Sequence, residues 1–319
     1  MSTSIKADIY AMRQLVKRDM KIFLKDKVTV FFSLLSPLIV FMLYVLFLKD
    51  LQYDSIKETL QAFSISKSLL EGFVDNWMIG GVLAVGCVSV SLSANSIMVA
   101  DKTKGILADS IASPIKRSVV KVSYYIFNFL VTVTIMFFIT MICFIYLGAS
   151  GGFRMNVGDV FAVLGTLLLS SLSATFITVF ITDFFKTEAA LGGFNGIMSA
   201  MIGFIIGAYM PMSVLPTAFK YISGLFPATH TACMFREFLM TDTLNEIAGE
   251  VPVPELINGL EEGYSMNLNF FGTVITSDMM TVFIMSVTVL FIVLNAVFYK
   301  RNNNFMDRKK PIKKKMKKA

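Results

Sequence analysis

The chain has 319 residues, of which 55% are hydrophobic and only 16% are charged, with a net charge of +7. A soluble protein carries about 25% charged residues, and the apolar residues here come in runs of about 20, the length that crosses a bilayer as a helix. The composition excludes an ordinary soluble domain.

Residues 1–27 predict an amphipathic helix that lies along a membrane surface. Apolar residues recur three or four positions apart and form one stripe, and basic residues largely fill the other faces. The stripe consists of Ile5, Ile9, Met12, Val16, Met20 and Phe23. We expect this helix to rest on the inner leaflet, with its basic groups among anionic head groups. A solvated leader is the alternative.

Six apolar segments within residues 28–300 are long enough to span the hydrocarbon as helices. None of the six contains Asp, Glu, Lys, Arg or His. They are Val28–Leu48, Trp77–Val99, Val122–Leu147, Val160–Thr182, Ala189–Met210 and Met279–Tyr299. The predicted fold class is therefore an all-α integral membrane protein with six transmembrane helices.

The second and fifth segments carry small residues. Ser89 and Ser93 lie in the second, and Gly196, Gly203 and Gly207 in the fifth recur at helical spacing. Small residues at this spacing let helix backbones approach closely in lipid. These five residues are candidates for a contact with a second copy or for the lining of a transport path. Packing within one subunit explains the pattern equally well.

The loop between the second and third segments, residues 101–115, predicts a short amphipathic helix. Leu107 and Ile111 project from one face, and Ser113 with Pro114 ends the helix, because proline disfavours helix in the residue before it. A short helix below the membrane suits docking into a groove on a soluble partner.

The region after the fifth segment, residues 211–278, is broken by prolines. Pro211, Pro216 and Pro227 cannot belong to one continuous helix, and the segment between the last two is apolar. We expect short re-entrant helices that dip into the outer leaflet. Residues 242–278 look like an acidic insertion, to which the sequence assigns no fold or role.

Basic residues predict the orientation. Of the 29 Lys and Arg residues, 23 fall in residues 1–27, 100–121, 183–188 and 300–319, and six fall in the segments on the other side. By the positive-inside rule, both termini are cytoplasmic in a multi-pass plasma-membrane protein. The basic tail, residues 301–319, is expected to contact acidic lipid. It carries no interleaved aromatic residues beyond Phe305, so we expect no nucleic-acid partner.

The chain offers no enzyme motif. It has no G-x-x-x-x-G-K-[ST] loop, so we expect no bound nucleotide, catalytic site or other cofactor. Cys87, Cys143 and Cys233 are scattered without metal-ligand spacing, and the lone His230 is interpreted as an interfacial polar residue. The charge-free segments also disfavour an ion-coupled carrier, which needs a titrating group in the bilayer.

The loop at residues 101–115 resembles the type-2 family of ABC transporter permeases. That family has a charged stretch, a glycine, and a hydrophobic pair leading to Ser/Thr-Pro. Here these are Asp101–Lys104, Gly105, and Ser113 with Pro114. The sequence departs from the family at Ile106, where threonine is usual, and at Ala108, where an acidic residue is usual.

A second block resembles the same family. After the fifth span the family shows a proline, a Leu-Pro pair, an aromatic–Pro pair, a Thr-Tyr-like pair and an arginine. This chain has Pro211, Pro216, Pro227, His230 in the place of tyrosine, and Arg236, in that order. The resemblance extends from the amphipathic amino terminus to the sixth span.

The resemblance implies a permease without its own ATPase site, docked through Gly105, Leu107, Ile111, Ser113 and Pro114 onto a separate ABC ATPase that binds ATP. It also implies a second permease copy or a paralogue, and export of a lipophilic, peptide or glycan-type substrate. The alternatives are a membrane-embedded ATPase-linked signalling or assembly subunit, or a secondary carrier.

Overall fold

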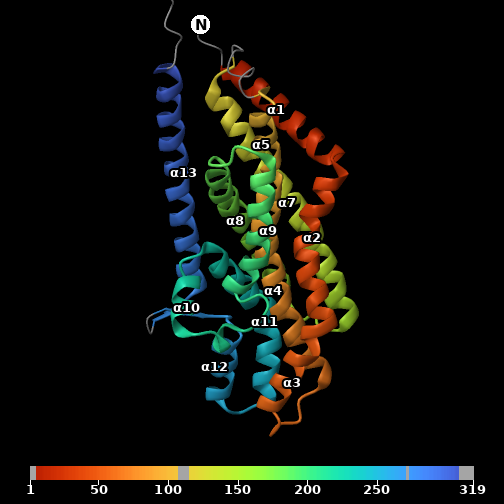
Figure 1. Ribbon diagram of the computed structural model, residues 1–319. Helices are drawn as coiled ribbons and strands as arrows, with labels where there is room; N and C mark the ends of the chain where they lie inside the picture. Colours follow the sequence, from red (N-terminus) through yellow and green to blue (C-terminus); the bar gives the residue numbers. More distant parts are fainter. Residues whose placement is uncertain (1–4, 107–114, 271–272, 309–319) are drawn as a thin grey trace, which may run out of the picture.

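The computed structural model of the protein describes residues 5–106, 115–270 and 273–308. Its helices form an elongated bundle with α1 (Ile5–Lys25) at one end and α12 (Pro254–Gly263) at the other (Figure 1). Within the described residues, five helices are long and apolar enough to cross a membrane, and one bent helical run would be a sixth.

The bent run is longer than the first predicted span, Val28–Leu48. α2 (Lys27–Leu43) continues through a π-helical turn, η1 (Tyr44–Leu48), into α3 (Lys49–Thr59). The run bends by 40° before Pro37, where the proline ring removes a helix hydrogen bond. The polar residues of α3 therefore extend the helix past the apolar segment that the sequence marks.

The centre of the bundle is the run of α4 (Lys67–Ala94) and α5 (Ser96–Thr103). α4 packs against α2, α7, α8 and α11, so most of its side chains are buried. The predicted span Trp77–Val99 lies wholly within this run. Because the helices extend it at both ends, Asp75 and Asp101 also become part of the span helices.

Three further helices contain the third, fourth and sixth predicted spans in full: α7 (Arg117–Ser150), α8 (Val157–Thr182) and α13 (Ser277–Arg308). α7 ends at Gly151, whose φ of 76° is left-handed, a common way to stop a helix. α13 packs mainly on α8 and α11 and stands at the edge of the bundle (Figure 1).

The fifth predicted span, Ala189–Met210, is wrong at its carboxyl end, because α9 (Glu188–Ile205) stops earlier. Gly207 has a left-handed φ of 65°, and the Ala208 N–H donates to the Gly203 carbonyl at 2.7 Å. Glycine adopts this conformation without the steric cost of a Cβ. Gly207, which the spacing predicts to lie on a helix face, therefore terminates the helix.

Short elements follow α9 at the end of the bundle opposite α1. Each helix of this region begins at or next to a proline: Pro211 precedes η2, Pro216 precedes α10, and Pro227 is the first residue of α11. α11 has 24 residues, so it is not one of the short helices that the sequence predicts. The elements are η2 (Met212–Val214), α10 (Thr217–Ser223), α11 (Pro227–Glu250), α12, and the antiparallel strands β1 (Leu268–Phe270) and β2 (Thr273–Ile275).

Candidate functional site

The segment that the sequence assigns to ATPase docking begins at the α1 end of the bundle. Gly105 follows α5 with a left-handed φ of 76°, and an added Cβ there would meet no atom of the described residues within 4 Å. Leu107, Ile111, Ser113 and Pro114 lie outside the described residues. The structure shows how the chain is held on each side of this segment.

Asp101, just before the segment, binds two other helices. Arg18 of α1 donates to both carboxylate oxygens at 2.7 Å, and the Tyr124 hydroxyl of α7 donates at 2.6 Å. Bidentate arginine–carboxylate pairs are strong and geometrically specific. The hydrogen bond to Asp101 raises the pKa of Arg18 above its usual range. One carboxylate, 3% exposed, thereby joins α1, α5 and α7.

Asp183, in the turn after α8, is a second junction. The Lys102 Nζ lies 3.2 Å from its Oδ1, and the Lys121 Nζ lies 2.5 Å from its Oδ2. On the far side of the docking segment, Lys116 pairs with Asp8 of α1. Charged contacts therefore hold both ends of the segment, so that a force on it would reach α1, α5, α7 and α8 together.

Asp19 of α1 lies beside the first junction. Its side chain is 1% exposed, and burial raises its pKa to about 7, although the Arg18 guanidinium at 3.0 Å opposes this rise. The charge of Asp101 raises it further. A raised carboxyl pKa stabilises the folded state at low pH. This stability is complete below the unfolded-state pKa of about 4 and is lost as the pH rises through the folded-state pKa.

We therefore expect the Tm of the purified protein to fall as the pH is raised from about 5 to about 8. Asp19→Asn removes the titrating group and should make this fall smaller, while every other ionisable group is retained. Thermal unfolding in detergent at several pH values measures the difference. Equal falls in both proteins would mean that Asp19 does not titrate in this range.

The apolar interior is crossed by a hydrogen-bond network that joins α4, α7 and α8. Asn128 of α7 donates to the Ser91 carbonyl at 2.7 Å and accepts from the hydroxyls of Ser91 at 2.7 Å and Thr175 at 2.9 Å. Asn95 and Thr178 extend the network, and all five residues are buried. Polar side chains hold transmembrane helices together in this way, so these groups support packing within the subunit.

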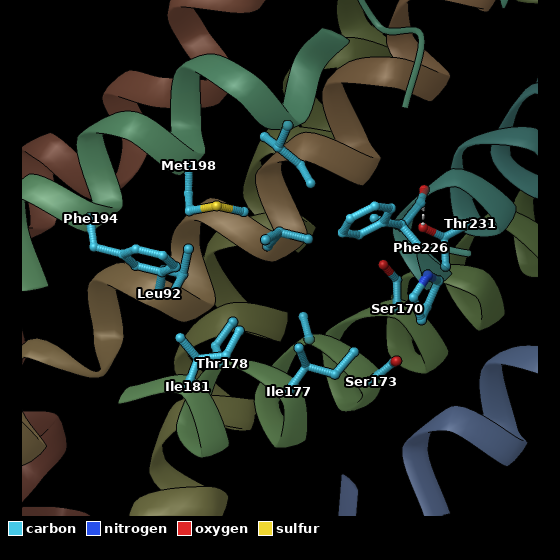
Figure 2. A pocket seen from close by; sticks show the side chains of 15 residues that line it. Leu92, Ser170, Ser173, Ile177, Thr178, Ile181, Phe194, Met198, Phe226 and Thr231 are labelled. Atoms are coloured by element: carbon cyan, nitrogen blue, oxygen red, sulfur yellow. Dashed lines mark hydrogen bonds between the residues drawn. The ribbon is translucent and has the colours of Figure 1, made fainter. Parts of the chain in front are cut away.

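A cavity of about 100 Å³ opens beside this network, between α4, α8, α9 and the start of α11 (Figure 2). Phe194 and Met198 of α9 face Ile177 and Ile181 of α8 across it (Figure 2). The Ser173 hydroxyl has no hydrogen-bond partner among the described residues. The lining is predominantly apolar, so the cavity suits an apolar group better than an ion.

The three candidate glycines do not share one free face. An added Cβ at Gly196 would meet no atom within 4 Å in the part of the chain that the structure describes, so that side of α9 is open there. At Gly203 it would lie 2.3 Å from the ring of Tyr209, and at Gly207 it would lie 2.9 Å from Met212. Gly203 and Gly207 are thus packed against this subunit's own side chains.

The two candidate serines lie at contacts inside the subunit. Ser89 is 2% exposed. The Ser93 hydroxyl accepts a hydrogen bond from the Asn195 amide of α9 at 3.0 Å. Ser93 therefore ties α4 to α9.

His230, one turn into α11, is buried among contacts that join helices. Its ring is 4% exposed and stacks on Phe283 of α13, with ring centres 4.2 Å apart. The Nε2 atom shares a hydrogen bond of 2.8 Å with the Gly224 carbonyl at the end of α10. The lone histidine thus fastens the start of α11 to α10 and α13.

Arg236, at the middle of α11, is fully buried. Its Nη2 donates to the Gly207 carbonyl at 2.6 Å and its Nε to the Trp77 carbonyl at 3.4 Å, and the guanidinium lies 5.2 Å from the centre of the Trp77 ring. Gly80 leaves the necessary room, because an added Cβ there would lie 2.7 Å from the Arg236 Cγ. The negative end of the α9 dipole helps to compensate the charge. Arg236 joins α11 to α4 and to the end of α9.

Buried charges just outside the predicted spans escaped the sequence reasoning. Asp75 of α4 is 0% exposed; it pairs with Lys49 at 3.0 Å and accepts hydrogen bonds of 3.2 Å from Tyr44 and Tyr146. Asp75 lies two residues before Trp77, the first residue of the second predicted span. The apolar residues on both sides of Asp75 are the signal in the sequence that indicates a buried position within the helix.

Among the described residues, no group of three or more His, Cys, Asp or Glu side chains could hold a metal ion. A comparison with protein-family models matches residues 10–240 to the ABC-2 type transporter model. A comparison with curated proteins gives no match. The matched residues run from α1 into α11 and include both charged junctions and Arg236. The chain therefore belongs to the ABC-2 type transporter family and is a multi-pass membrane permease subunit of an ABC transporter.

Proposed function

We propose that this chain is the permease of an ATP-driven exporter and works with a separate ATPase subunit that docks on residues 101–115. The charged junctions at the two ends of that segment carry the proposal. Asp101 and Asp183 connect it to α1, α7 and α8 through short ion pairs. A segment held in this way passes a movement of its partner to several spans at once. ATP binds to the partner subunit, and both termini lie in the cytoplasm.

A second permease copy or a paralogue completes the transporter in this proposal. α9 lies at the surface of the bundle, with only 17% of its residues buried. Among the described residues, no atom fills the space that a Cβ would take at Gly192, Gly193 or Gly196. Small residues let helices approach closely in lipid. This supports a contact between permeases along the amino-terminal half of α9.

The apolar cavity between α8 and α9 supports a lipophilic substrate, or a substrate with an apolar part. The residues that line the cavity run from Ile181 to Ser170 along α8, a stretch of helix roughly 16 Å long. Its far end lies against Pro227 and Thr231 at the start of α11. An apolar group would thus move along α8 toward the end of the bundle that we place outside.

Ile111→Glu tests the docking segment. The change places an unpaired carboxylate at the contact, which costs on the order of 2–5 kcal/mol if it stays buried. We therefore expect the variant to lose stable association with a co-expressed ABC ATPase. Co-purification and substrate-stimulated ATP hydrolysis are the measurements.

Lys102 is unsuitable as the control, because it is tied to Asp183 rather than free at a rim. Lys104 is exposed, and Lys104→Ala should cost well under about 1 kcal/mol. If Ile111→Glu inserts correctly and behaves like Lys104→Ala in both measurements, residues 101–115 are not the coupling element.

A further inference from the structure

A second cavity, of about 220 Å³, lies at the end of the bundle opposite α1. One wall includes Lys220 of α10, and the other comes from α12 and the start of the β-hairpin. Apolar cavities near 150 Å³ already hold a benzene ring, so this space is large enough for a small molecule or a lipid head group. The proposed ATP coupling makes no use of it.

Two opposite charges line this cavity from its two walls without forming an ion pair. The Lys220 ammonium has no hydrogen bond or ion pair with any residue that the structure describes, and the Glu262 carboxylate of α12 accepts one long hydrogen bond, of 3.5 Å, from the Asn269 amide. An ammonium and a carboxylate that line one cavity and remain unpaired are complementary to a ligand that carries both charges.

Ser265 supplies independent evidence that a partner is missing. It lines the same cavity and is 2% exposed, yet its hydroxyl has no hydrogen-bond partner within the described part of the chain. Buried polar side chains nearly always have a partner. Ser265 also has a φ of 56°, a backbone conformation that residues other than glycine rarely adopt. Asn267, alongside, donates its amide N–H to Glu261 at 3.2 Å, which leaves its amide oxygen as an acceptor.

We propose that this cavity binds a zwitterionic group, with its anion at Lys220 and its ammonium at Glu262. Ser265 donates to the anion, and the Asn267 amide oxygen accepts from the ammonium. A ligand with an anion alone would leave Glu262 unpaired. The group is either the phosphoethanolamine head of a membrane lipid or a soluble zwitterion of the same chemistry. The site stands whether or not the chain couples to an ATPase.

The test uses the purified full-length protein and two amine probes. Soluble phosphoethanolamine is titrated by calorimetry, and lipid retention is measured by native mass spectrometry from nanodiscs of phosphatidylethanolamine or of phosphatidylglycerol, which lacks the amine. We expect saturable binding of at least one amine probe. Lys220→Ala and Glu262→Gln should each weaken it about tenfold or more, because each removes one charge-assisted contact.

Lys57→Ala and Glu255→Gln are the controls, since both residues are exposed. They belong to α3 and α12, which lie at the end of the bundle opposite α1 (Figure 1). Both should bind like the wild type. A double variant that exchanges the two charges, Lys220→Glu with Glu262→Lys, should bind the amine probe more tightly than either single charge reversal. This comparison distinguishes a loss of ligand recognition from a loss of folding.

The two probes also identify the source of the ligand. Binding of the lipid alone assigns the site to the membrane, and binding of phosphoethanolamine alone assigns it to a soluble zwitterion. The proposal is wrong if neither probe saturates, if phosphatidylglycerol is retained as well as phosphatidylethanolamine, or if Lys220→Ala and Glu262→Gln match the wild type.

Discussion

Arg236→Ala is expected to destabilise the protein by on the order of 3 kcal/mol. The change removes the hydrogen bonds to the carbonyls of Gly207 and Trp77, and bonds from a charged donor contribute about 1.5–3 kcal/mol. It also leaves a void between α4, α11 and the end of α9, where large-to-small substitutions cost about 2–5 kcal/mol. Part of this loss is offset, because the variant no longer buries a charge.

Thermal unfolding in detergent measures the effect, and Arg154→Ala is the matched control. Arg154 pairs with Glu246 at 2.5 Å at the same end of the bundle, but Glu246 is about half exposed. Such a pair contributes less than about 1 kcal/mol. Arg236→Lys keeps the charge but loses the planar fork, so an intermediate loss is expected. If Arg236→Ala and Arg154→Ala lower the Tm equally, Arg236 does not hold the three helices together.

Separating Arg18 from Asp101 is expected to have the second large effect. In a double-mutant cycle with Arg18→Met and Asp101→Asn, we expect a coupling energy of about 2 kcal/mol. The pair is bidentate and Asp101 is nearly buried, but the Arg18 side chain is 32% exposed, so solvent screens part of the interaction. Either single variant should also reduce substrate-stimulated ATP hydrolysis by the assembled transporter, because the docking segment loses its attachment to α1.

The control cycle uses Lys67 and Glu71, which pair at 3.5 Å on the surface of α4. Exposed pairs four residues apart on a helix contribute about 0.2–0.5 kcal/mol. A coupling energy for Arg18 and Asp101 as small as this would show that the junction does not attach α1. If both single variants keep full substrate-stimulated ATP hydrolysis, the contact between Arg18 and Asp101 takes no part in coupling.

The sequence by itself determined the class of the protein and the position of most helices. Trp77–Val99, Val122–Leu147, Val160–Thr182 and Met279–Tyr299 all lie inside helices of the structure. An uninterrupted apolar run is a local property, and its length alone decides whether a helix can cross the hydrocarbon. The motif resemblance at residues 101–115 and 211–236 predicted an ABC permease, and the family match confirms this.

Helix ends and the roles of the glycines depended on more than spacing. The pattern in α9 predicted one face carrying Gly196, Gly203 and Gly207. The left-handed turn at Gly207 instead ends the helix and folds Tyr209 back onto Gly203. A spacing rule holds only while the helix continues, and a glycine fits both a helix face and a helix stop.

Only the tertiary structure decided which charges are buried and which partners they have. Arg18 and Asp101 are 83 residues apart in the chain, and Arg236 is bound by carbonyls of α4 and of the turn after α9. Partners so distant leave no local pattern, and backbone carbonyls are present at every position. The sequence marks these residues only as polar groups near the ends of apolar runs. Whether such a group faces water or a partner is set by the packing of helices from different parts of the chain, because burying a charge is tolerated only where a partner is held in place.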